Sequence, residues 1–139
     1  MTGSRHFLLR SSETSDWIEF TSLDELSDWS FDIRAFFRGY AVKETSVTLG
    51  DLSTFANDLV TFERTRKGKA CISGTYDFEF AVEAFERRGS ALVTFSLTNL
   101  LHLPNNKYGR CLLEAAFVVN GEYVASMCRG LAALAAPIN

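Results

Sequence analysis

Between Trp29 and Phe37 apolar and polar residues alternate with a period of two, which predicts a half-buried antiparallel strand. The apolar positions share one face: Trp29, Phe31, Ile33, Ala35 and Phe37. Arg38-Gly39-Tyr40 predicts a turn, and residues 41–47 predict a returning strand. Shorter apolar stretches at 6–10 and 16–21 indicate two more strands before this pair.

After Thr48 the spacing changes from two to three and four. Leu52, Phe55, Leu59 and Phe62 then share one face, which predicts an amphipathic helix over about 50–67. Thr48 is the predicted N-cap, and Gly68 is the predicted left-handed residue after the last turn.

Period-two alternation returns in the second half of the chain. Residues 69–75 and 76–86 predict two strands, and in the second of them Asp77, Glu79 and Glu83 face away from Phe78 and Phe80. A turn at 87–90 and a strand at 91–97 follow. Residues 101–109 contain Pro104-Asn105-Asn106 and predict a loop, before a strand at 110–119.

The last segment allows two interpretations. Asn120-Gly121 between apolar stretches is typical of a hairpin turn. The apolar residues that follow instead have a helical period, and alanine is abundant, so we predict a helix over 121–136 with Asn120 as its cap. The element order predicts an α+β fold, with an antiparallel sheet and both helices packed on one face.

Length and composition place this fold in one domain. The chain has 139 residues, of which 47% are hydrophobic, and these values suit a single domain over residues 1–139 with an acidic segment at 1–28. The net charge of −3 argues against nucleic-acid binding. No apolar stretch is long enough to predict a membrane span, and no secretory signal is evident, so we expect a cytoplasmic protein. Its three cysteines, Cys71, Cys111 and Cys128, are then expected to be reduced core residues.

The residues that usually carry chemistry form no recognisable motif. His6 and His102 have no nucleophile at a diagnostic spacing, the cysteines lack metal-ligand spacing, and the glycines form no phosphate loop. Glu79 and Glu83 would lie about 13 Å apart on one strand face, which is too far for a pair of glycosidase carboxylates. We therefore expect no enzyme activity, no metal and no cofactor.

Four features give the chain a resemblance to the WapI-type bacterial immunity proteins and their uncharacterised relatives. They are the turn Phe37-Arg38-Gly39-Tyr40, the helix residues Leu52, Phe55 and Leu59, the step Gly68-Lys69-Ala70, and a hairpin with Arg88-Gly89 followed by Ala91-Leu92-Val93. The resemblance covers about residues 29–136. The resemblance implies a cytoplasmic protein that binds and neutralises a toxin domain, and it carries over no site residues.

The expected function is therefore non-enzymatic binding of a basic toxin domain by occlusion. The predicted contact residues are the acids Asp77, Glu79 and Glu83, or Asp24, Glu25 and Asp28. Two alternatives stay open: a small-ligand-binding α+β protein, and a secretion chaperone or adaptor. The predicted edge strands could also support a homodimer.

Overall fold

The computed structural model describes residues 5–22, 30–86 and 89–135, and these residues form two antiparallel four-stranded sheets and two helices. In the first sheet β1 (His6–Arg10), β2 (Trp17–Ser22), β3 (Ser30–Phe37) and β4 (Tyr40–Thr48) pair in chain order. In the second sheet β5 (Lys69–Ser73), β6 (Glu79–Phe85), β7 (Ser90–Leu103) and β8 (Lys107–Val119) do the same. The predicted α+β class is confirmed.

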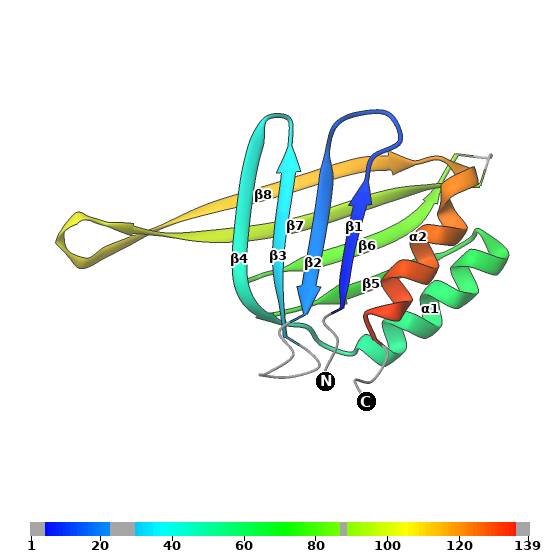
Figure 1. Cartoon of the computed structure of the whole chain (residues 1–139), viewed down its shortest axis with the longest axis horizontal. Helices are drawn as coiled ribbons and strands as arrows, with labels where there is room; N and C mark the ends of the chain where they lie inside the picture. Colours follow the sequence, from blue (N-terminus) through cyan, green and yellow to red (C-terminus); the bar gives the residue numbers. More distant parts are fainter. Residues whose placement is uncertain (1–4, 23–29, 87–88, 136–139) are drawn as a thin grey trace.

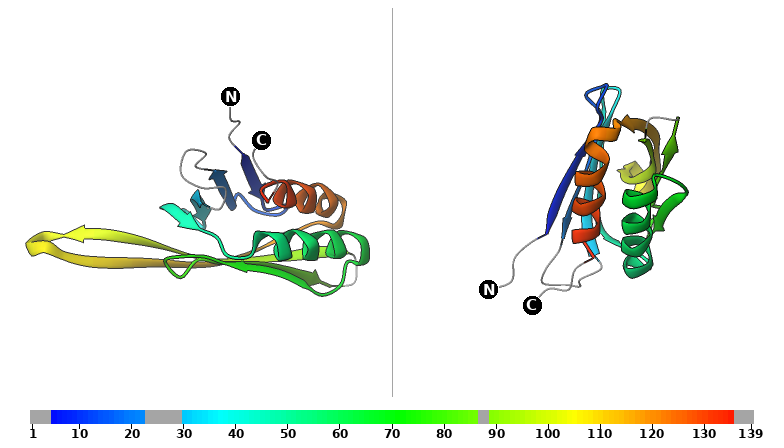
Figure 2. Two further views of the ribbon diagram at one scale, coloured as in Figure 1. Left: turned by 90° about the horizontal axis from the view of Figure 1, so that it is seen from below. Right: turned by 90° about the vertical axis from the view of Figure 1, so that its right-hand side faces the viewer.

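The first sheet and both helices lie on one face of the second sheet (Figure 1 and Figure 2). Helix α1 (Leu52–Thr65) contacts β5, and α2 (Gly121–Ala133) contacts α1, β7 and β1. Helix α1 lies between β4, the last strand of the first sheet, and β5, the first strand of the second sheet. Outside the named strands, a single bridge between Leu49 and Gly74 joins the two halves at this point of the described chain.

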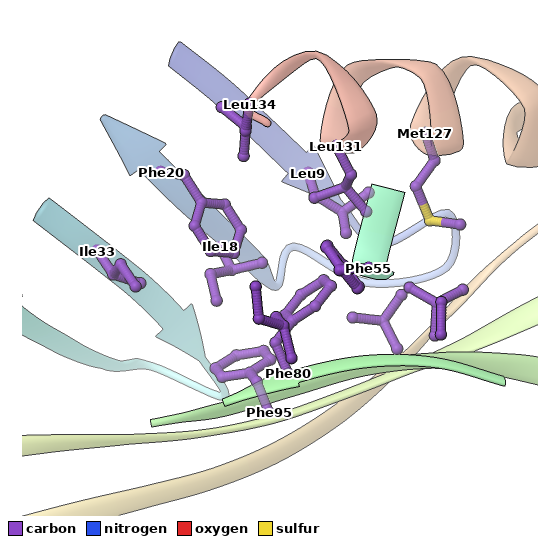
Figure 3. Packing of buried hydrophobic residues seen from close by; sticks show 14 of the residues in the cluster. Leu9, Ile18, Phe20, Ile33, Phe55, Phe80, Phe95, Met127, Leu131 and Leu134 are labelled. Carbon is purple, nitrogen blue, oxygen red and sulfur yellow. The ribbon is translucent and has the colours of Figure 1, made fainter. Parts of the chain in front are cut away.

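The core lies between the layers and is rich in phenylalanine. Phe20 of β2 makes edge-to-face contacts with Phe78 and Phe80, at ring-centroid distances of 6.1 and 5.4 Å. Phe55 of α1 also meets Phe80 edge to face, at 6.1 Å. Figure 3 shows how side chains from both sheets and both helices meet here. Such pairs add specific attraction to the large apolar area that aromatic rings bury.

Both predicted caps of the first helix shift inward. Thr48 ends β4, and Asp51 is the N-cap; its carboxylate accepts bonds from the Thr54 backbone N–H at 2.9 Å and from the Thr54 hydroxyl at 2.6 Å. These bonds, led by the one from the hydroxyl, lower the pKa of Asp51. At the other end Arg66, with φ 55°, takes the left-handed position predicted for Gly68, which itself has φ +83°.

A network of hydrogen bonds from its side chain holds Arg66 in this unfavourable conformation. Its Nη1 donates to the carbonyl oxygens of Gly89 and Gly121, at 3.0 and 3.1 Å, and its Nε donates to the Glu63 carbonyl at 2.9 Å. Arg66 thus ties the end of α1 to the β6–β7 turn and to the start of α2.

The loop predicted over 101–109 is wrong. Strand β7 continues to Leu103, a single 3₁₀ turn at Pro104–Asn106 reverses the chain, and β8 begins at Lys107. Pro104 and the two asparagines, which both have positive φ, form only the tip of a long hairpin. This hairpin extends well past β4, at the left of Figure 1.

The C-terminal segment is helical, as preferred, and ends at Ala133. Asn120 occupies the N-cap position without a side-chain cap bond. Gly130, a weak point in the helical pattern, packs directly on a ring of β1: a Cβ added there would lie 2.1 Å from Phe7 Cε1. The missing side chain lets α2 approach the first sheet.

Candidate functional site

The outer face of the second sheet, turned away from the helices and the first sheet, is uncovered in the described structure (Figure 2). We call it the acidic face, and define it by the outward residues of four strands: Lys69, Cys71, Ser73, Glu79, Ala81, Glu83, Thr94, Ser96, Glu114 and Ala116. Inward neighbours such as Phe80, Val82 and Val93 are buried, so alternation along each strand separates the two faces.

A shallow hollow of about 560 Å³ lies on this face. All of its lining residues belong to β5, β6, β7 and β8. Small side chains form its floor, because the register places Cys71 next to Ala81 and Ala81 next to Thr94. Since one sheet supplies the entire lining, the hollow has a floor and a rim but no roof.

Three carboxylates surround the hollow. Glu79 lies opposite Ser96, Ser96 lies opposite Glu114, and Glu83 lies opposite Lys69 and Leu92 on the neighbouring strands. Within the described part of the chain, none of the three glutamates forms an ion pair or a hydrogen bond through its side chain. Their charges are thus available to a partner.

Asp77 differs from its two predicted companions. It lies in the turn before β6 with φ 60°, next to Tyr76 with φ 59°, and so it is not part of the strand. Its carboxylate forms an ion pair with Arg110 of β8, and both side chains are largely exposed. Arg110 therefore compensates the charge of Asp77, while Glu79 and Glu83 share the outer face as expected.

The other predicted contact residues, Asp24, Glu25 and Asp28, lie outside the described residues. Of the three cysteines, Cys128 is buried as expected. Cys71 and Cys111 are exposed, so their prediction as core residues is wrong. Cys71 lies on the acidic face, and Cys111 lies in the β7–β8 hairpin opposite Asn99.

The outer face of the first sheet carries a second polar cluster, which the sequence reasoning missed. We call it the aromatic face, defined by His6, Trp17, Glu19, Arg34 and Phe36. Trp17 stacks on Phe36 at a centroid distance of 6.2 Å, and the Arg34 guanidinium lies 5.8 Å from the Trp17 ring. The signal was available, because Trp17 alternates with Ile18 and Phe20, which are buried.

The charged side chains of the aromatic face form hydrogen bonds and ion pairs with one another. Glu19 Oε2 lies 2.7 Å from His6 Nε2, and Arg34 Nε donates to Glu19 Oε1 at 2.7 Å. The His6 bond, followed by the bond and charge of Arg34, lowers the pKa of Glu19 against the opposing effect of its partial burial. This cluster is a self-contained network across three strands.

Among the described residues, no group of three or more His, Cys, Asp or Glu side chains could hold a metal ion. In the same part of the chain, none of the helices is long and apolar enough to cross a membrane. Comparisons of the chain with protein-family models, with curated proteins and with solved structures find no match.

Proposed function

We propose that the protein binds a basic protein surface through its acidic face, and that this partner is a toxin domain that it neutralises without any reaction of its own. The observation that carries the proposal is a set of three carboxylates, Glu79, Glu83 and Glu114, that have no partner among the described residues and lie on a sheet face that no described residue covers. The class of partner rests on the resemblance to WapI-type immunity proteins.

The chemistry of the face supports protein binding more than binding of a small ligand. Small-molecule sites enclose most of the ligand surface, whereas this hollow is lined by one sheet alone. An open hollow with a floor of small side chains suits one or two protruding side chains of a protein, such as lysine or arginine. The charged end of a lysine or arginine would then form charge-assisted hydrogen bonds with the carboxylates at the rim of the hollow.

Binding at such a face would neutralise a toxin by occlusion. Toxins that act on nucleic acids or other anionic substrates need basic clefts, and an acidic face that covers such a cleft excludes the substrate. Opposite charges would steer the encounter, and the contacts at the hollow would set the lifetime of the complex.

The test is co-expression in bacteria with the toxin domain encoded beside this chain. We expect the wild type to restore growth, and the double variant Glu79→Lys/Glu83→Lys to lose this protection, because it places two positive charges at the rim. Affinity for the purified domain should fall at least about 100-fold.

The matched control is Asp58→Lys/Glu13→Lys, which changes the net charge by the same amount at exposed positions away from the acidic face. It should protect like the wild type. Unchanged killing in the presence of the wild type would contradict the immunity role, and equal loss from both double variants would contradict the assignment to this face.

A further inference from the structure

Strand β8 forms an open edge of the second sheet. It pairs with β7 from Lys107 to Val119, and in the described chain one backbone hydrogen bond reaches its other side, from Ser12 N–H to the Val118 carbonyl at 3.0 Å. Residues along a strand turn their N–H and C=O groups alternately to opposite sides. The residues that share the outward orientation of Val118 are therefore Arg110, Leu112, Glu114 and Ala116.

The projecting hairpin also exposes apolar side chains near this open edge. Leu112 is 53% exposed, Leu103 at the tip of the hairpin is 41% exposed, and Cys111 is exposed. Cys111 falls on the same side of β8 as Ala115 and Phe117, which are buried, whereas Cys111 itself is exposed. A long edge that remains open and exposes large apolar side chains favours pairing with another strand.

We propose that this edge pairs with β8 of a second copy of the chain, antiparallel about a two-fold axis at Leu112. Each Arg110 then lies directly opposite Glu114 of the other copy, so the dimer gains two cross-strand pairs of opposite charge. The two Leu112 side chains meet at the axis. A strand with this charge order is complementary to itself in the antiparallel direction.

The neighbouring two-fold registers lack this match. An axis at Arg110 or at Glu114 places two like charges directly opposite each other. An axis at Cys111 places Arg110 opposite Leu112, and an axis at Leu113 places Glu114 opposite Leu112. Opposed like charges destabilise a strand pair, so charge selects the register centred on Leu112.

The ion pair of Arg110 with Asp77 does not oppose this arrangement. Both side chains are more than half exposed, and a guanidinium has five N–H donors, so Arg110 can contact both carboxylates. Strand addition at an edge extends the sheet in its own plane. The dimer would therefore have one continuous eight-stranded sheet, with both acidic faces on the same side.

Sedimentation equilibrium of the full chain over a range of concentrations tests the dimer. Glu114→Arg should weaken dimerisation about tenfold or more, because it places two arginines opposite each other at both cross-strand pairs. The charge swap Arg110→Glu/Glu114→Arg should restore dimerisation, because it restores opposite charges at both pairs. All variants would carry Asp77→Asn, so that the intramolecular ion pair does not contribute. A monomeric wild type, or a double variant no better than Glu114→Arg, would overturn the proposal.

Disulfide cross-linking tests the register independently of charge. In a Cys71→Ser/Cys111→Ser background, Leu112→Cys should form a covalent dimer under mild oxidation, because directly opposed hydrogen-bonded residues have Cα atoms about 5.5 Å apart. Glu114→Cys in the same background should not cross-link. Efficient cross-linking through Glu114→Cys, or none through Leu112→Cys, would contradict the register.

Discussion

The outer faces of the two sheets are both polar, and no described residue covers either of them, but they differ in how their charges are compensated. On the aromatic face Glu19 is held by His6 and Arg34, and Arg34 also lies over Trp17. On the acidic face Glu79 and Glu83 contact no described cation.

Exposure alone therefore does not identify a binding face. The charges of the aromatic face already compensate one another, so a charged partner gains less there. The carboxylates of the acidic face can gain partners without losing any. An aromatic and basic cluster would ordinarily suggest a hot spot, yet here its charged groups already contact one another across β1, β2 and β3.

The first sheet should also be held tightly on its inner side, where Phe7 covers Gly130 of α2. Gly130→Ala should lower the free energy of unfolding by about 1–3 kcal/mol, because the new Cβ would lie 2.1 Å from Phe7 Cε1 and the ring or the helix must move. Urea denaturation measures this change. Alanine ordinarily favours a helix over glycine by about 1 kcal/mol, so the sign of the effect is informative.

The control for Gly130→Ala is the same substitution in a Phe7→Ala background. Without the ring, the alanine should gain its usual helical advantage, and the double variant should be at least as stable as Phe7→Ala. If Gly130→Ala stabilised the protein with Phe7 present, the close contact between α2 and the first sheet would be refuted.

Cys128 in the interior and Cys71 on the acidic face should differ in their titration and in their reactivity. Burial, and then the nearby charge of Glu63, raise the pKa of Cys128 to about 11 from 9.0. Between these pH values the folded chain keeps a proton that the unfolded chain loses, so stability should decline as pH rises, on the order of 1–2 kcal/mol. Cys128→Ala should flatten this decline in denaturation curves.

At neutral pH a thiol reagent should modify exposed Cys71 in the hollow quickly and buried Cys128 only on unfolding. Comparison of Cys111→Ser with Cys71→Ser/Cys111→Ser isolates the Cys71 signal. Slow labelling of Cys71 in the purified chain would mean that the acidic face is covered.

Period-two and helical spacing predicted most of the elements because alternation and burial coincide in them, as in β3 and α1. The long hairpin was missed because Pro104 and two asparagines resemble a loop, although the strands on either side continue to the turn. The separation into two sheets depends on tertiary pairing, which spacing along a chain does not encode. Thr48 could not serve as the N-cap because it is the last residue of β4, so Asp51, three residues later, caps the helix instead.

The candidate site was predicted in part for the same reason. Glu79 and Glu83 could be placed on one face from the strand period, whereas Glu114 joins them through the β7–β8 register. The engagement of Asp77 with Arg110 spans 33 positions in the chain and could not be predicted from local pattern.

The most direct measurement is amide chemical-shift mapping by NMR of the isotope-labelled chain, titrated with the purified toxin domain. The largest perturbations should fall on β5, β6 and β7 around Cys71, Ala81 and Thr94. Signals of Trp17, Glu19 and Arg34 should stay nearly unchanged. Perturbations centred on the aromatic face, with the acidic face silent, would contradict the central claim.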